Sequence, residues 1–273
     1  MNTLNTKLLI AVFACLGLFT LPASAATRHV DCDAGGTISA ALETGKGSAN
    51  VLEIFVNGTC NEVITIVRDH VTIAGDPYAT INGTVRVFTA NRVTLENLAI
   101  TGPGDGVIIS GTGQVRLRWV YIAGNDGYGL NIRRDGAAWV RDSMIVGDCI
   151  GIEDVDCEDG AFVDHATLEL ARTTISNSRY GIMADAATLI LFNAEIADNS
   201  VIGVQVALHS TVDIRSNTRF HGNGVHSLYA LQDSAIRIKS DRAEIGGHIG
   251  CEDGESSLAV PLGFPVWTDC SGF

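Results

Sequence analysis

Apolar and polar residues alternate over short stretches along most of the chain, with the period of two that is typical of β-strands. The alternation recurs at Val93/Leu95, Val115/Leu117, Ala138/Val140, Leu168/Leu170, Leu189/Leu191, Val212/Ile214 and Ile236/Ile238. Helical spacing is absent from this stretch of the sequence. The pattern therefore predicts many short strands, each with one buried face.

The strands belong to a repeat of about 22 residues. A glycine followed by an apolar residue recurs at spacings of 23, 22, 30 and 22, at Gly106-Val107, Gly129-Leu130, Gly151-Ile152, Gly181-Ile182 and Gly203-Val204. An apolar residue near the end of each unit recurs at spacings of 22, 23, 30, 21 and 24, at Ile100, Ile122, Ile145, Ile175, Ile196 and Phe220. Both landmarks share one long interval, which predicts a single insertion of about eight residues around Cys157 to Asp164.

A repeat of this length, with about three short strands, is typical of one rung of a parallel β-helix. We therefore expect an all-β solenoid of roughly nine rungs over residues 51–250, with a length of about 40 Å at ~4.8 Å per rung. A β-sandwich or an antiparallel propeller is the alternative fold. It would require hairpin turns between the strands and a period nearer 40 residues, and the sequence shows neither.

Both ends of such a rod need a cap, because exposed strand edges invite aggregation. Residues 26–50 are predicted to form the N-terminal cap, with a short amphipathic helix from Thr37 to Thr44 that places Ile38, Ala41 and Leu42 on one face. Residues 251–273, which do not repeat, are predicted to form a C-terminal tail.

The first 25 residues are typical of a secretory signal peptide: Lys7, an apolar run from Leu8 to Leu21, and small residues up to Ala25. The run is too short to span a bilayer comfortably, so we predict cleavage after Ala25. An uncleaved membrane anchor is the alternative. No later segment of the sequence is long and apolar enough to cross a membrane, so the mature protein is expected in the periplasm or outside the cell.

The mature chain of 248 residues would carry 17 basic and 31 acidic residues, since Lys7 leaves with the signal. This acidic balance argues against nucleic acid as a partner, because binding to phosphates needs a basic surface. No pattern in the sequence specifies an oligomeric state.

Six cysteines remain after cleavage, and an even number in an exported chain indicates disulfides. Six cysteines allow fifteen pairings. They fall into three groups along the chain, which favours nearest-neighbour pairs: Cys32–Cys60, Cys149–Cys157 and Cys251–Cys270. A metal site is the less favoured alternative, because the sequence has no Cys-x-x-Cys and no histidine at ligand spacing.

Three segments together resemble the opening rungs of the pectin-lyase-like right-handed parallel β-helix superfamily: Val56-Asn57-Gly58-Thr59-Cys60-Asn61-Glu62-Val63, Val71-Thr72-Ile73-Ala74-Gly75 and Val93-Thr94-Leu95-Glu96-Asn97-Leu98-Ala99-Ile100-Thr101-Gly102. The resemblance covers about residues 30–250. It implies a right-handed solenoid and a polysaccharide partner, since the superfamily includes pectate lyases, polygalacturonases, and alginate lyases and epimerases. It implies no particular reaction, because function depends on the site that a fold carries.

Fragments similar to the polygalacturonase site occur at Gly147-Asp148, Gly247-His248 and Arg237-Ile238-Lys239. One aspartate and one glycine of that pattern are missing, and His248 follows the Arg-x-Lys segment instead of preceding it. Glycoside hydrolysis needs a paired acid and base at a fixed separation. No such pair can be assembled here, so the sequence assigns no catalytic residue.

Residues that flank the buried alternation must point outward. On neighbouring rungs this rule places Arg116 beside Trp139 and Arg118 beside Arg141, with Glu169 on the next rung. An indole can stack on a sugar ring, and arginine can bind a carboxylate through two hydrogen bonds. These five residues are the predicted carbohydrate-binding site. The alternative is that they are ordinary solvent-facing side chains.

The densest acidic run in the chain contains Asp148, Glu153, Asp154 and Asp156, followed by Glu158 and Asp159. Calcium prefers several convergent oxygen ligands, so the first four residues are a candidate calcium site. A solvated acidic loop held by Cys149–Cys157 is the favoured interpretation. Apart from calcium, the sequence indicates no cofactor.

Two functions follow from these patterns. The favoured one is an exported β-helix protein that binds or lies against a polysaccharide and carries no recognisable catalytic constellation. The alternative is a lyase, hydrolase or epimerase that acts on an acidic glycan through an unrecognised site.

Overall fold

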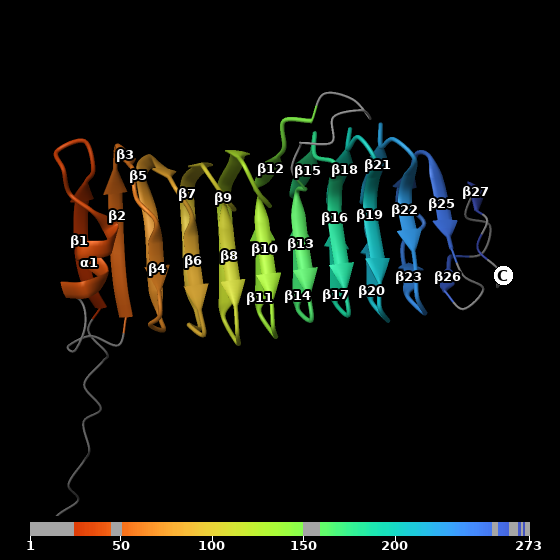
Figure 1. Ribbon diagram of the computed structural model, residues 1–273, viewed down its shortest axis with the longest axis horizontal. Helices are drawn as coiled ribbons and strands as arrows, with labels where there is room; N and C mark the ends of the chain where they lie inside the picture. The colour runs from red at the N-terminus through yellow and green to blue at the C-terminus, as the bar shows by residue number, and fades with distance from the viewer. Residues whose placement is uncertain are drawn as a thin grey trace, which may run out of the picture.

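The computed structural model describes residues 25–44, 51–149, 159–252, 256–261, 267–268 and 270. The described chain winds into a straight parallel β-helix with its N-terminal end at α1 and its C-terminal end at β27 (Figure 1). Each turn contributes strands to three faces, and every strand pair in the described chain is parallel. This is the all-β solenoid that the repeat predicts.

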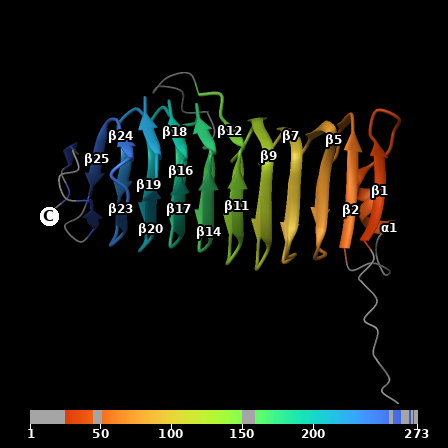
Figure 2. The ribbon, with the colours of Figure 1, turned by 180° about the vertical axis from the view of Figure 1, so that it is seen from behind.

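The first face, which is toward the viewer in Figure 2, is formed by β1 (Ala25–Asp31), β2 (Val51–Asn57), the first parts of β5 (Val71–Asn82), β7 (Val93–Gly102) and β9 (Gln114–Asn125), then β11 (Ala137–Arg141), β14 (Thr167–Ala171), β17 (Thr188–Phe192), β20 (Thr211–Arg215), β23 (Ala235–Ile238) and β26 (Ser257–Ala259). The second face is formed by β3 (Thr59–Cys60), the last parts of β5, β7 and β9, then β12 (Met144–Val146), β15 (Thr174–Ser176), β18 (Glu195–Ala197), β21 (Arg219–His221) and β24 (Glu244–Ile245).

The third face is a ten-stranded sheet made of β4 (Ile64–Ile66), β6 (Val85–Phe88), β8 (Val107–Ser110), β10 (Leu130–Arg133), β13 (Ala161–Asp164), β16 (Tyr180–Asp185), β19 (Ile202–Ala207), β22 (His226–Ala230), β25 (His248–Cys251) and β27 (Trp267–Thr268). Ten strands on this face agree with the roughly nine rungs expected from the repeat.

Side chains of like position stack into columns through the core. The apolar landmark at the end of each unit is one such column, in which each residue pairs with the next: Ile100, Ile122, Ile145, Ile175, Ile196 and Phe220. All six are at most 1% exposed. The seven alternating pairs of the first face stack in the same way. The apolar pattern therefore gave the register of these two faces correctly.

The predicted position of the insertion is wrong. On the third face Leu130 pairs with Ala161, and Ala161 pairs with Ile182. Gly160-Ala161, and not Gly151-Ile152, therefore continues the glycine landmark. The additional residues lie between β12 and Gly160, before the regular strand β13. The pattern was misleading because Gly151-Ile152 has the right residue types at the expected spacing.

A steric requirement distinguishes the true glycine column. A Cβ atom on Gly160 or on Gly181 would lie 2.5 Å from the carbonyl oxygen of the next glycine in the column, Gly181 and Gly203 respectively. Gly106 and Gly129 meet the same obstacle at 2.6 and 2.9 Å. Successive turns thus approach backbone to backbone at this corner, and only glycine fits.

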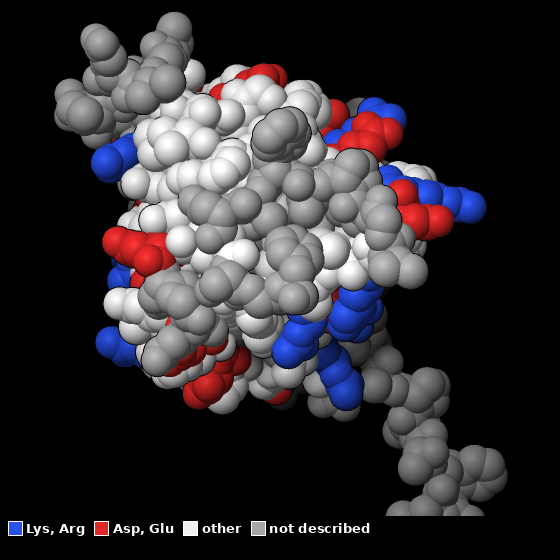
Figure 3. Space-filling model, turned by 90° about the vertical axis from the view of Figure 1, so that its right-hand side faces the viewer, with Lys and Arg blue, Asp and Glu red and all other residues white. Residues whose placement is uncertain are grey.

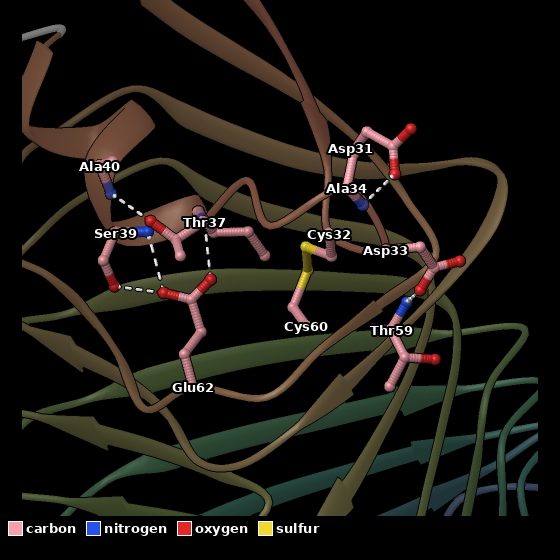
Figure 4. The surroundings of a disulfide bond; sticks show 11 residues. Asp31, Cys32, Asp33, Ala34, Thr37, Ser39, Ala40, Thr59, Cys60 and Glu62 are labelled. Atoms are coloured by element: carbon pink, nitrogen blue, oxygen red, sulfur yellow. Dashed lines mark hydrogen bonds between the residues drawn. A yellow bond between two sulfur atoms is a disulfide. The ribbon is translucent and has the colours of Figure 1, made fainter.

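Helix α1 (Ile38–Thr44) covers the N-terminal end of the rod, with Ile38, Ala41 and Leu42 buried as predicted. Figure 4 shows how its first turn is held. The Glu62 carboxylate accepts hydrogen bonds from the Ile38 and Ser39 amides at 2.6 and 3.1 Å. Thr37 Oγ1 accepts one from the Ala40 amide at 3.2 Å. These groups satisfy amides that a helix N-terminus otherwise leaves unpaired.

Two of the predicted disulfides are present, Cys32–Cys60 beside α1 and Cys251–Cys270 at the C-terminal end. Cys149 is also disulfide-bonded, but its predicted partner Cys157 lies outside the described residues. The predicted signal peptide lies outside them as well, apart from Ala25. Among the described helices, none has the length and apolar character needed to cross a bilayer.

Candidate functional site

The outward side of the first face brings together the five predicted carbohydrate-binding residues. In the parallel register, Arg116 of β9 pairs with Trp139 of β11, and Trp139 pairs with Glu169 of β14. Arg118 pairs with Arg141 in the same register. Their positions alternate with fully or almost fully buried apolar residues on each strand. The period of two is thus the reason that all five side chains share one surface.

These five side chains line an open groove of about 560 Å³: Arg116, Arg118, Trp139, Arg141 and Glu169. We call this the arginine groove. It runs over three adjacent strands, which lie side by side in Figure 2. Viewed along the rod from its C-terminal end, Lys and Arg side chains gather at the lower right, on the side of the first face, which carries the groove and a second basic group around Asp213 (Figure 3).

The positive charge of the groove is only partly compensated. Arg118 Nη1 lies 3.8 Å from Glu96, whereas Arg116 and Arg141 form no ion pair within the described part of the chain. The field of the groove extends to Asp142. The pKa of Asp142 is lowered first by its hydrogen bond from Arg172, and Arg141 and Arg118 lower it further. A negatively charged ligand would therefore find guanidinium groups free to bind it.

A second basic group farther along the same face is compensated internally. Lys239 Nζ and Arg215 Nη2 lie 2.6 and 2.9 Å from Asp213 Oδ2, and Arg237 lies 3.9 Å from Oδ1. Burial raises the pKa of Asp213, but the hydrogen bonds from Lys239 and Arg215 outweigh it and lower the pKa overall. These cations are already engaged, so the arginine groove is the better anion site.

The groove presents groups that can bind an anionic ligand. Two free guanidinium groups can hold carboxylates through paired hydrogen bonds, and the half-buried Trp139 ring lies between Arg116 and Glu169. Glu169 is the single carboxylate among the described groove residues. Glycoside hydrolysis by a pair of carboxyl groups is therefore not built into this groove.

The third face carries a polar cluster that sequence reasoning missed. Asp105 accepts hydrogen bonds from the Tyr128 amide at 2.9 Å and from Asn131 Nδ2 at 2.6 Å. Asn131 Oδ1 in turn accepts one from Arg133 Nε at 2.7 Å. We call these four residues, together with Asp159, the third-face cluster.

Two groups of the third-face cluster have pKa values above their ordinary ones. Burial raises the pKa of Asp159, although the Tyr180 amide and Arg179 oppose the effect. Burial also raises the pKa of the Tyr128 hydroxyl, and the charge of Asp159 adds to it. Asp159 can thus hold a proton at a higher pH than an ordinary carboxyl, and displaced pKa values are one mark of functional sites.

One sequence signal could have revealed the third-face cluster. Tyr128 and Asp159 each stand directly before a glycine of the true column, Gly129 and Gly160. The incorrect assignment of Gly151 to that column hid the relation between them.

The fragments that resemble a polygalacturonase site are not brought together. Asp148 is exposed and follows β12 on the second face, Arg237 and Lys239 flank the buried Ile238 on the first face, and His248 begins β25 on the third. The His248 Nδ1 atom lies 3.0 Å from His226 Nδ1. Their separation on three faces excludes a shared site of this kind.

The calcium prediction rests mainly on residues outside the described part of the chain. Of the four candidate ligands only Asp148 is described, whereas Glu153, Asp154 and Asp156 are not. Within the described residues, one group has metal-ligand geometry, formed by Cys32, Cys60 and Glu62. Because its two sulfur atoms form a disulfide, it offers no thiolate pair to a metal.

A family model described as the right-handed β-helix region matches residues 83–250, which is more than half of the chain. The chain belongs to the right-handed β-helix family. The match spans the stacked turns from Gly83 to β25, and it includes the arginine groove and the third-face cluster. None of the curated proteins compared with this β-helix protein matches it.

Three solved structures of low sequence identity are similar to this chain, and the first of them shares its fold. The pectate lyase Pel9A superposes with a TM-score of 0.57 at 11% identity, over 92% of this chain and 80% of that protein. An alginate lyase from a Paenibacillus species gives a TM-score of 0.43 at 10% identity, over 88% and 97% of the two chains. The A-module of the mannuronan C-5 epimerase AlgE4 from Azotobacter vinelandii gives 0.36 at 12% identity, over 86% and 95%.

Proposed function

We propose that this β-helix protein is exported and binds an acidic polysaccharide in the arginine groove, without catalysing a reaction on it. The observation that carries the proposal is the presence of two guanidinium groups, on Arg116 and Arg141, without an ion pair in the described chain. They flank the indole of Trp139 on a face of otherwise regular strands.

The shape of the groove supports a polymeric ligand. It is an open groove of about 560 Å³ that crosses three adjacent strands. The fold is shared with a protein named a pectate lyase, which makes pectate a rational first ligand to test. The disulfides at both ends of the rod suit an oxidising compartment outside the cytoplasm.

Affinity electrophoresis through gels that contain polygalacturonate or alginate tests the proposal. The wild-type protein is expected to be retarded by at least one of the two polymers. Trp139→Ala combined with Arg141→Ala should remove the retardation, because it deletes the ring and one of the uncompensated charges.

A matched control replaces an arginine and an aromatic residue on another face. Arg86 and Phe88 of β6 are both exposed on the third face and, like Trp139 and Arg141, are two residues apart. Arg86→Ala combined with Phe88→Ala should leave retardation unchanged. Equal mobility of wild type and the groove variant in both gels would contradict binding in the groove.

The alternative is an enzyme that acts on an acidic glycan, and the third-face cluster favours it. Asp159, with its raised pKa, can serve as a proton donor, and the Tyr128 hydroxyl is a second donor nearby. Incubation with pectate and alginate should give no unsaturated product by ultraviolet absorbance and no new reducing ends. Product formation by wild type that Tyr128→Phe abolishes would establish the enzyme and refute the proposed non-catalytic function.

A further inference from the structure

On six consecutive turns, the corner between the first and second faces is formed by one residue in the left-handed backbone region. These six residues are equivalent in register and have φ between 49° and 55°: Asn97, Trp119, Asp142, Arg172, Asn193 and Ser216. Asparagine and aspartate adopt this conformation more readily than other non-glycine residues. The corner therefore selects small polar residues on most turns.

Trp119 is the exception: its ring contacts the Arg118 guanidinium, but this contact leaves nearly half of the side chain exposed. Arg172 is also large, but it forms a two-bond ion pair with Asp142 at 2.6 and 2.8 Å. Trp119 remains 45% exposed at φ 52°, so burial does not offset its unfavourable conformation. A strained and exposed aromatic residue points to a contact outside the folded chain.

Three more exposed side chains lie at or beside the same corner. Tyr121 of β9 points outward on the second face beside Met144 of β12, and the two are 39% and 46% exposed. Tyr78 of β5 is 49% exposed. It lies at this corner two turns earlier, because the next residue, Ala79, pairs with Leu98, which pairs with Val120. Burial raises the pKa of the Tyr78 hydroxyl, and the charge of Tyr121 raises it further. We call Tyr78, Trp119, Tyr121 and Met144 the corner patch.

The corner patch is continuous with the arginine groove. The guanidinium carbon of Arg118 lies 4.5 Å from the centroid of the Trp119 ring, and the same Arg118 side chain lines the groove. Arg118 is the last first-face residue before the corner, and Trp119 is the corner itself. A ligand that leaves the groove toward this edge therefore meets the aromatic rings next.

We propose that the corner patch is a second subsite for the glycan bound in the arginine groove, where the apolar face of a pyranose ring stacks on Trp119 and Tyr121. This inference rests on the proposed function. The glycan would cross strands β9, β11 and β12 and pass around the corner. Its carboxylates would lie in the arginine groove, and the face of one sugar ring would lie on the corner patch. Continuity through Arg118 favours the glycan over a protein partner as occupant.

Trp119→Asn separates binding from folding. Asparagine is the residue that the same corner uses at Asn97 and Asn193, so the variant should fold and should melt at a higher temperature than wild type. Affinity for long polygalacturonate oligomers, measured by calorimetry, should nevertheless fall by about tenfold, the upper range for loss of an aromatic contact. Trp119→Phe should retain most of the affinity.

Oligomer length provides the second readout. A trisaccharide that fills only the groove should bind wild type and Trp119→Asn equally, whereas longer oligomers should bind wild type more tightly. Equal affinity of both proteins for every length would overturn the second subsite and leave the groove intact. Trp119→Asn could instead lose binding while the double variant Trp139→Ala with Arg141→Ala keeps it. That result would overturn both the proposed binding in the groove and the proposal that the groove and the corner patch hold one glycan. Self-association that depends on Trp119, seen by sedimentation velocity, would assign the patch to a second copy instead.

Discussion

The Asp159 carboxylate is largely buried on the third face. Burial raises its pKa, so the folded protein binds a proton there more readily than the unfolded chain does. Ionised Asp159 therefore lowers stability at neutral pH. The penalty fades as the pH falls through the folded pKa, and it is absent below the ordinary value of 3.8.

Asp159→Asn should raise the free energy of unfolding at pH 7 by about 1 kcal/mol. The amide oxygen can still accept the hydrogen bond that Asp159 Oδ1 receives from the Tyr180 amide at 3.1 Å, so only the charge is lost. Urea unfolding at pH 7 and below pH 4 measures the effect, and the gain should disappear in acid.

Asp142→Asn is the control of opposite sign. The Arg172 hydrogen bond lowers the pKa of Asp142, so this carboxylate stabilises the fold above its unfolded pKa, and the contribution is lost in acid. The variant should be less stable than wild type at pH 7. A stability gain for Asp159→Asn that persists unchanged below pH 4 would show that charge is not the cause.

At the scale of single residues, the sequence placed side chains well where strand alternation alone decides direction. The five residues of the arginine groove follow from the period of two, because position along the strand fixes the face. Trp119 was missed for a physical reason: it leaves the strand at a left-handed corner, where alternation no longer determines direction. The third-face cluster was missed because its residues follow turns and depend on the glycine register.

At the scale of elements, too, some features followed from the sequence pattern and others did not. The buried column from Ile100 to Phe220 was predicted without error, since a large apolar residue is required on every turn. The glycine column was placed wrongly at one turn, because glycines serve both turns and close backbone contacts. The pairing of Ala161 with Leu130 and Ile182 identifies Gly160 as the true member, and the carbonyl oxygen of the neighbouring turn, 2.5 Å from a Cβ at Gly160, explains why glycine is required there.

The Cys32–Cys60 bond ties the capping segment to the first turns, and the two cysteines have a sequence separation of 28. Cys32→Ser combined with Cys60→Ser should lower the stability of this end by about 2–4 kcal/mol, through the chain entropy released on unfolding. In a solenoid each turn contacts only its neighbours. The loss of protection against hydrogen exchange should therefore be confined to β1, α1 and β2.

The opposite end provides the matched control for this prediction. Cys251→Ser combined with Cys270→Ser should reduce protection in β22 and β25 and leave β2 unchanged. A uniform loss along the rod in either variant would mean that the whole helix unfolds as one cooperative unit, against the neighbour-only expectation.

At the scale of the whole molecule, the arginine groove is a basic site on an acidic protein, whose formal net charge is −13. The net charge and the positive charge of the groove act over different distances. At 10 mM salt the Debye length is about 30 Å, so an approaching polyanion feels the net charge, whereas near 150 mM it is about 8 Å and the local guanidinium groups dominate. The overall charge thus opposes association at low salt, and contact in the groove favours it.

The rate of association with immobilised polygalacturonate should therefore rise between 10 and about 150 mM salt. The rate of dissociation should rise over the same range, because screening weakens the arginine–carboxylate contacts. Surface plasmon resonance resolves the two rates, and Arg116→Gln should speed dissociation more than it slows association. An association rate that falls steadily with salt would mean that the field of the groove outweighs the net charge at every distance, as in ordinary encounters between opposite charges.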